Sequence, residues 1–145
     1  MNRFEKAFSL HEKGYNCAQA VIGAYADTIG IDEQAAFSIG AGFGGGAGTG
    51  ELCGAISGAV MVLGLLTPVD PEDPVGSKQR TTALSKAFQK RFAEKFGYLR
   101  CHDLLRNPTQ ASDATPAAQA MGVTHHCRLM IVTAVEIVEE MLAER

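Results

Sequence analysis

Apolar residues recur every three to four positions through most of the chain, which is the spacing that places side chains on one face of an α-helix. In residues 78–96, Leu84, Phe88 and Phe92 follow this spacing, with charged residues between them. The pattern predicts helices over 2–13, 17–28, 33–39, 51–66, 78–96 and 125–143, with a short turn or helical segment at 101–103 and a short helical segment at 116–121. No segment alternates as a β-strand does. We therefore expect an all-α bundle of five to six helices, with a glycine-rich loop before the central helix.

Residues that favour helix ends support these boundaries. Side chains able to cap a helix N-terminus precede four of the predicted helices: Asn16, Asp32, Ser77 and Thr124. Residues 67–76 contain three prolines and three acidic residues, which predicts a rigid polar connection. Residues 107–115 are also polar and contain a proline, so we expect a second loop there.

Length and composition describe a globular chain. With 145 residues, 46% hydrophobic content and a net charge of −3, we expect one domain spanning residues 1–145. The N-terminus has no continuous apolar region of the secretory kind, and residues 52–66 are too short to cross a bilayer, so a cytoplasmic setting is expected. Four cysteines in that compartment indicate redox or metal chemistry more often than static disulfides.

The most unusual stretch is residues 39–66, where a glycine-rich run precedes one cysteine and an apolar segment. Thr49 or Gly50 can cap a helix there, which would place Cys53 in the first turn, where an anion is stabilised and a thiol ionises more readily. Gly54 and Gly58 leave one face of this helix bare, so a neighbouring helix can approach closely. That face can pack within the chain or against a second copy, which would make a homodimer.

The other cysteines share this placement. Cys17 and Cys127 also lie at predicted helix starts on the buried face, while Cys101 follows a helix end. No pair forms C-x-x-C, so zinc-finger and thioredoxin spacings are absent. If the bundle brings the four sulfurs together, it gathers several activated thiols. A buried cysteine can equally be a small hydrophobic residue that only packs.

Two further patterns carry less weight. Residues 40–45 match G-x-G-x-x-G, but no strand precedes them, so dinucleotide binding is not expected. Residues 78–106 contain eight of the thirteen Lys and Arg residues. A solvated face explains this better than an anionic partner, and no nucleic acid is expected, because the whole chain is acidic and no aromatic residues interleave with the basic ones.

The cysteines and their neighbours resemble one known family. Residues 14–21 (GYNCAQAV), residues 53–58 (CGAISG), Cys101 and the pair His126-Cys127 are similar to the C_GCAxxG_C_C family of putative redox-active proteins. The resemblance covers nearly the whole chain and implies that Cys17, Cys53, Cys101 and Cys127 are the family cysteines. Some members are labelled selenoproteins, which points to redox chemistry. Members often lie near transporter genes, which implies association with a membrane transporter.

Two functions remain open. In the first, Cys53 attacks a disulfide or oxidant of an unknown redox partner, Cys127 or Cys101 resolves the intermediate, and His102 or His126 holds the proton. In the second, the four cysteines, with His126 as a further ligand, hold zinc, copper or an iron–sulfur cluster. A helical protein whose cysteines merely pack is the third interpretation.

Overall fold

The computed structural model describes residues 1–109 and 114–145, and its secondary structure is helical. These residues form eight α-helices: α1 (Arg3–Glu12), α2 (Cys17–Ile29), α3 (Glu33–Gly40), α4 (Gly54–Leu66), α5 (Pro74–Phe96), α6 (Cys101–Arg106), α7 (Pro116–Met121) and α8 (His126–Ala143). Two short helical turns, η1 (Ala41–Phe43) and η2 (Gly46–Gly50), lie between α3 and α4. The all-α prediction is confirmed for the described residues, but the expected number of helices, five to six, was too low.

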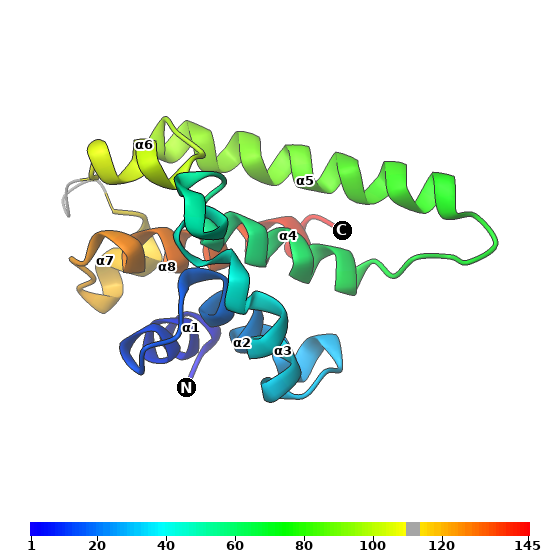
Figure 1. Ribbon diagram of the computed structural model, residues 1–145, viewed down its shortest axis with the longest axis horizontal. Coiled ribbons are helices and arrows are strands. Elements are labelled where there is room, and N and C mark those ends of the chain that lie inside the picture. The colour runs from blue at the N-terminus through cyan, green and yellow to red at the C-terminus, as the bar shows by residue number, and fades with distance from the viewer. Residues whose placement is uncertain (110–113) are drawn as a thin grey trace.

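Helices α2, α4 and α8 contact one another and form the centre of the bundle. Helix α1 packs against α2 and α8, α3 against α2, α5 against α4 and α8, and α7 against α8. Figure 1 shows α5 running along one side of the molecule and α1 to α3 on the opposite side, with α4 and α8 between them. None of the described helices is long and apolar enough to cross a membrane.

The hydrophobic core follows the predicted helix faces. Phe88, Phe92 and Phe96 of α5 are buried, as are Ile131 and Val138 of α8. Burial of such large side chains stabilises a fold by about 1.5–3 kcal/mol each. The side chains in the N-terminal half of α5 are mostly exposed, so this half of the helix contributes little to the core.

Some helix ends match the sequence and others do not. Asn16 caps α2 in a reciprocal arrangement in which its side chain accepts from the Gln19 amide and Gln19 accepts from the Asn16 amide. Asp32 caps α3 as expected. Ser77 does not cap α5, which begins at Pro74 with Asp73 as its cap. The hydroxyl of Ser77 is instead buried and accepts from the Asp70 amide, so the connection over residues 67–76 is shorter than predicted.

The remaining boundary errors lie beside cysteines. Helix α8 begins at His126, with His125 rather than Thr124 at the capping position. Helix α4 begins at Gly54, so neither Thr49 nor Gly50 is its cap. Residues 110–113 of the predicted polar loop over 107–115 lie outside the described residues.

Candidate functional site

Four separate helix starts bring the four cysteines to one place. Cys17 is the first residue of α2, Cys53 directly precedes α4, Cys101 is the first residue of α6, and Cys127 is the second residue of α8. All four line a single cavity of about 150 Å³. The rest of its wall is Gly45, Gly54, Leu104, Leu105, His126 and Met130. The expectation that folding gathers these sulfurs is therefore met in the described part of the chain.

Small residues allow α2 and α4 to approach closely enough for this. A Cβ placed on Gly54 would lie 3.3 Å from the Cβ of Cys17 and 2.8 Å from the Phe43 carbonyl oxygen. A Cβ on Gly58 would lie 2.9 Å from the carbonyl oxygen of Ala18. Such distances are shorter than side chains tolerate, so glycine is required at both positions. The bare face of α4 thus packs within the chain, against α2.

A short antiparallel contact joins Cys53 to Cys101. Leu52 and Arg100 form an isolated β-bridge. The Cys53 amide donates to the Leu99 carbonyl at 2.9 Å, and the Cys101 amide donates to the Glu51 carbonyl at 2.6 Å. The side chains of Arg100 and Glu51 add an ion pair at 2.9 Å. In this arrangement Cys53 and Cys101 lie on the same face of the paired segments, one diagonal step apart.

The glycine-rich segment forms one edge of the cavity. Gly45, Gly46 and Gly48 have positive φ angles, as does Ala47 at 58°. The chain therefore makes a left-handed turn, which glycine adopts more readily than other residues. A Cβ on Gly50 would lie 3.2 Å from the Cβ of His102, which shows how closely the turn packs on α6. Much of the predicted glycine-rich loop therefore forms short helical turns rather than an open loop.

The cysteine pKa values differ sharply within the cavity. Interaction with the neighbouring Cys17 thiol is the main cause that lowers the pKa of Cys127 to about 7. The nearby Arg128 guanidinium lowers it further, against the opposing effect of burial. The same interaction between the two thiols, together with burial, raises the pKa of Cys17 well above its ordinary value. These surroundings favour Cys127 over Cys17 as the member of the pair that ionises.

Burial reverses the expectation for Cys53. Its side chain is only 5% exposed, and burial raises its pKa to about 11, although the Ala55 and Ile56 amides at the start of α4 act in the opposite direction. Burial also raises the pKa of Cys101. The prediction that Cys53 ionises more readily than a free thiol was thus wrong, because the sequence could not show how completely this sulfur is removed from water.

All four sulfurs influence one another electrostatically. Cys17 interacts with the other three, Cys53 with Cys101 and Cys127, and Cys101 with Cys127, so every pair among the four is coupled. Even so, across residues 1–109 and 114–145 no three His, Cys, Asp or Glu side chains lie close enough together to hold one metal ion. The expected ligand set of four cysteines with His126 therefore lines a shared cavity without converging on a single point.

The two histidines expected to move protons have different surroundings. His126 lines the cavity, and within the described residues its buried Nδ1 atom has no hydrogen-bond partner. Burial, and to a lesser degree His125, lowers the pKa of His126. His102 is exposed on α6 and does not line the cavity.

Sequence reasoning missed a contact behind Cys127. The Arg128 Nε atom donates to Nδ1 of His11 at 3.1 Å, and the His11 and His125 rings lie 5.5 Å apart. This contact positions the guanidinium whose charge lowers the pKa of Cys127. His11 lies 117 positions from Arg128, so no local pattern could have indicated the pairing.

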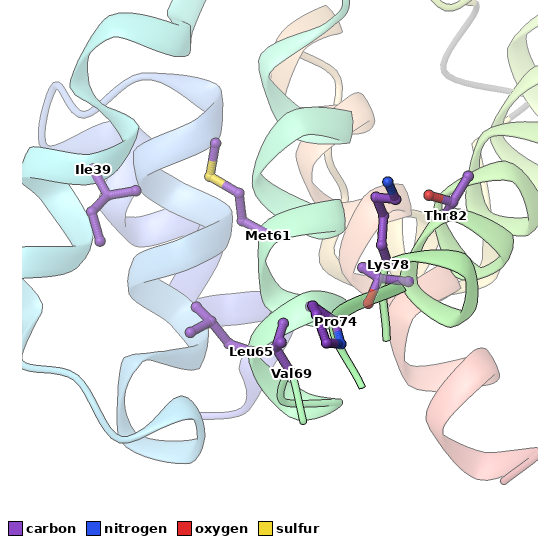
Figure 2. A pocket seen from close by; sticks show the side chains of 9 residues that line it. Ile39, Met61, Leu65, Val69, Pro74, Lys78 and Thr82 are labelled. Atoms are coloured by element: carbon purple, nitrogen blue, oxygen red, sulfur yellow. The ribbon is translucent and has the colours of Figure 1, made fainter. Parts of the chain in front are cut away.

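A larger hollow lies away from the cysteines. It measures about 580 Å³ and is lined by α3, α4 and the start of α5. Figure 2 shows Met61 and Leu65 of α4 near Ile39, with Lys78 and Thr82 across the hollow on α5. Among the described residues, its lining has no cysteine and only one ionisable group, Lys78, whereas all four cysteines line the smaller cavity.

Comparison with known proteins agrees with the placement of the cysteines. Residues 15–141 match the model of the family described as "Putative redox-active protein (C_GCAxxG_C_C)". No curated protein and no solved structure matches the chain. The matched region begins just before Cys17 and extends through most of α8, so it contains all four cavity cysteines. The chain belongs to the C_GCAxxG_C_C family of putative redox-active proteins.

Proposed function

We propose that the protein is a thiol oxidoreductase in which Cys127 is the attacking thiol and Cys17 resolves the intermediate. The observation that carries the proposal is that Cys17 and Cys127 line one cavity, where the interaction between the two thiols is the main cause of the lowered pKa of Cys127. A thiolate is the nucleophile in disulfide exchange, and a pKa close to the ambient pH is the optimum for the attacking thiol. Cys127 meets both requirements, whereas burial keeps Cys53 protonated at neutral pH.

The proposed reaction transfers two electrons to a small disulfide. The Cys127 thiolate attacks one sulfur of the substrate, and the substrate S–S bond breaks as a mixed disulfide with Cys127 forms. The first substrate half leaves as a thiolate and takes up a proton. Cys17 then attacks the Cys127 sulfur, which forms the Cys17–Cys127 disulfide and releases the second half. The proton of Cys17 ends on that second thiol, so one substrate disulfide becomes two thiols.

The surroundings support this sequence of steps. Once Cys127 is part of a mixed disulfide, it carries no charge, so the hydrogen bond and the repulsion that raise the pKa of Cys17 are removed together. His126 borders the cavity, and its Nδ1 atom makes no hydrogen bond to any described residue, so we assign it the role of accepting the Cys17 proton before it passes to the leaving thiol. The absence of a converging ligand set among the described residues favours this function over metal binding.

The experiment uses the Cys53→Ser/Cys101→Ser double variant, which contains only the proposed pair. Oxidation with a small disulfide such as hydroxyethyl disulfide, followed by acid quenching, alkylation and peptide mass mapping, should yield a Cys17–Cys127 disulfide. Adding Cys17→Ser to this variant should stop the reaction at a mixed disulfide on Cys127. A variant that instead keeps Cys17 but carries Cys127→Ser should form no adduct. If the double variant leaves both thiols free, or Cys17 carries the adduct in place of Cys127, the proposal is wrong.

A further inference from the structure

The Arg128 guanidinium pairs with uncharged groups rather than with a carboxylate. Its Nε atom donates to Nδ1 of His11 at 3.1 Å, and its Cζ atom lies 5.3 Å from the centre of the Phe8 ring. Nδ1 of His11 must be unprotonated to accept this bond, and burial and nearby charges lower the pKa of His11 below its ordinary 6.5. Four other arginines form ion pairs with carboxylates of described residues instead: Arg3, Arg80, Arg91 and Arg100.

The contacts with α1 position this cation near the proposed attacking thiol. Arg128 directly follows Cys127 in the first turn of α8, and both side chains are only partly buried. The charge of Arg128 also acts on the Cys127 sulfur, since it is one of the causes that lower the pKa of that thiol. The guanidinium is therefore available to an anionic group of a molecule that approaches Cys127.

Acidic residues near the cysteines do not cancel this charge. Glu51 pairs with Arg100 at 2.9 Å, and Asp103 of α6 does not line the cavity. Within the described part of the chain, no carboxylate is among the charges that shift the pKa values of the four cysteines. Apart from the thiolate itself, the local charge at Cys127 is thus positive, although the whole chain has a net charge of −3.

We propose that Arg128 selects anionic substrates, namely small disulfides with a carboxylate on each half, which Cys127 attacks in preference to neutral or cationic ones. This inference rests on the proposed function, because it names the substrate class of the same attacking thiol. For opposite unit charges about 8 Å apart near a protein surface, the attraction changes a rate by about 2- to 30-fold. The repulsion of a cationic disulfide has a similar size, so the two effects multiply when an anionic and a cationic disulfide are compared.

The selected substrate is reduced by the steps already proposed. The Cys127 thiolate attacks one sulfur, the substrate S–S bond breaks, and one half leaves as a thiolate that takes up a proton. The other half is now joined to Cys127 by a disulfide, and its carboxylate stays near Arg128. Cys17 then attacks the Cys127 sulfur, and the second half leaves with the proton of Cys17. Arg128 attracts the substrate and neither gains nor loses a proton or an electron.

The test compares three small disulfides of different charge: dithiodipropionate (anionic), hydroxyethyl disulfide (neutral) and cystamine (cationic). The protein is the Cys53→Ser/Cys101→Ser variant, and the measured quantity is the rate of Cys17–Cys127 disulfide formation at low salt. Each rate is divided by that of the same disulfide with 2-mercaptoethanol, an uncharged thiol, which corrects for differences between leaving groups. The anionic disulfide should react fastest and the cationic one slowest, with a ratio of about 5-fold or more between them. Because the net charge of the chain predicts the opposite order, equal rates or a faster reaction with cystamine would overturn the proposal.

Substitutions then assign the preference to one side chain. In the same background, Arg128→Gln should lower the ratio of anionic to cationic rates by about 5-fold or more. The accompanying change in the pKa of Cys127 affects every disulfide alike and cancels in the ratio. Arg128→Lys keeps the charge and should keep most of the ratio. Lys78→Gln, in the hollow away from the cysteines, is the matched control for net charge and should leave the ratio unchanged. An unchanged ratio in Arg128→Gln, or an equal loss in Lys78→Gln, would refute the assignment.

Salt gives a second readout that needs no change at Arg128. Raising the ionic strength from about 0.01 M to about 1 M shortens the Debye length from about 30 Å to about 3 Å, so the ratio should approach one. A ratio that does not respond to salt would show that shape rather than charge separates the substrates, contrary to the proposal. Equal normalised rates for the three disulfides would reject this inference alone, because the Cys17–Cys127 disulfide still forms. If no disulfide forms it, the proposed function is wrong and this inference is wrong with it.

Discussion

Replacing Cys17 by alanine removes the donor that lowers the pKa of Cys127. The interaction with Cys17 is the largest cause of the lowered pKa, ahead of burial, which raises the pKa, and of the Arg128 charge, which lowers it. Without it, burial raises the pKa while Arg128 lowers it, and we expect a value near the ordinary 9.0 in place of about 7. The variant therefore tests directly whether the pair, rather than the surrounding charge, activates Cys127.

The expected change in rate follows from two opposing effects. At pH 7 the thiolate fraction of Cys127 should fall from about one half to about 1%, a loss of about 50-fold. A thiolate of higher pKa is intrinsically more nucleophilic, and with a Brønsted coefficient of about 0.4–0.5 two pKa units return about 6- to 10-fold. The net loss at pH 7 is then about 5- to 8-fold, whereas above pH 10 the variant should react about 6- to 10-fold faster.

The assay is the pH dependence of alkylation by iodoacetamide, with Cys53→Ser and Cys101→Ser also present so that Cys127 alone reports in the Cys17→Ala protein. The matched control is Cys17→Ser in the same background, because a hydroxyl can still donate to the thiolate. We expect the serine variant to keep an apparent pKa well below that of the alanine variant. Each rate profile also gives its limiting value at high pH, which tests the predicted reversal.

The reasoning would be refuted by an alanine variant that still titrates near pH 7. The thiolate would then be stabilised by Arg128 or by another group, and the pairing of the two sulfurs would have no chemical consequence. A profile that moves to higher pH in both variants alike would also count against the hydrogen bond, since it would reflect the loss of sulfur itself.

Three further predictions concern stability. Gly58→Ala should destabilise the fold by about 1–3 kcal/mol in urea unfolding, because the added Cβ would lie 2.9 Å from the Ala18 carbonyl oxygen. The control is Gly64→Ala in the same helix, where the nearest neighbour of the added Cβ is 3.6 Å away. That variant should be neutral or stabilising by up to about 1 kcal/mol. Asn16→Ala should lower the free energy of unfolding by about 0.5–2 kcal/mol through loss of the α2 cap. The loss should be larger if the side-chain bonds of Asn16 to the carbonyl oxygens of residues 40 and 41 also contribute. An unchanged urea midpoint would exclude a stabilising role for Asn16. Burial, and then the charges of Arg128 and His125, lower the pKa of His11 below its ordinary 6.5. The unfolded chain therefore binds the proton more readily, and the free energy of unfolding should fall as the pH drops below about 6.5. His11→Gln should flatten this pH dependence, and a slope identical to that of the wild-type protein would contradict the prediction.

The sequence by itself determined the elements that begin at strong local signals. Asn16 and Asp32 have side chains that satisfy the first amides of a helix, so α2 and α3 begin where expected. The apolar spacing of α5 identified its buried face, which includes Phe88 and Phe92. Gly54 and Gly58 indicated a close contact between helices. The structure contains that contact, since the start of α2 occupies the space that side chains at these positions would need.

Only the tertiary structure decided the pKa values of the four cysteines and which cysteines lie close to one another. Cys53 was expected to be acidic because it lies near a helix start, but its burial outweighs the amides of α4. The antiparallel contact that pairs Cys53 with Cys101 joins segments nearly fifty positions apart, and the partner of Cys127 lies at the opposite end of the chain. Local patterns report which amides a residue can cap and which face it shares. The pKa of a thiol depends instead on water and on neighbouring charges, and these are set by the packing of segments that are distant in sequence.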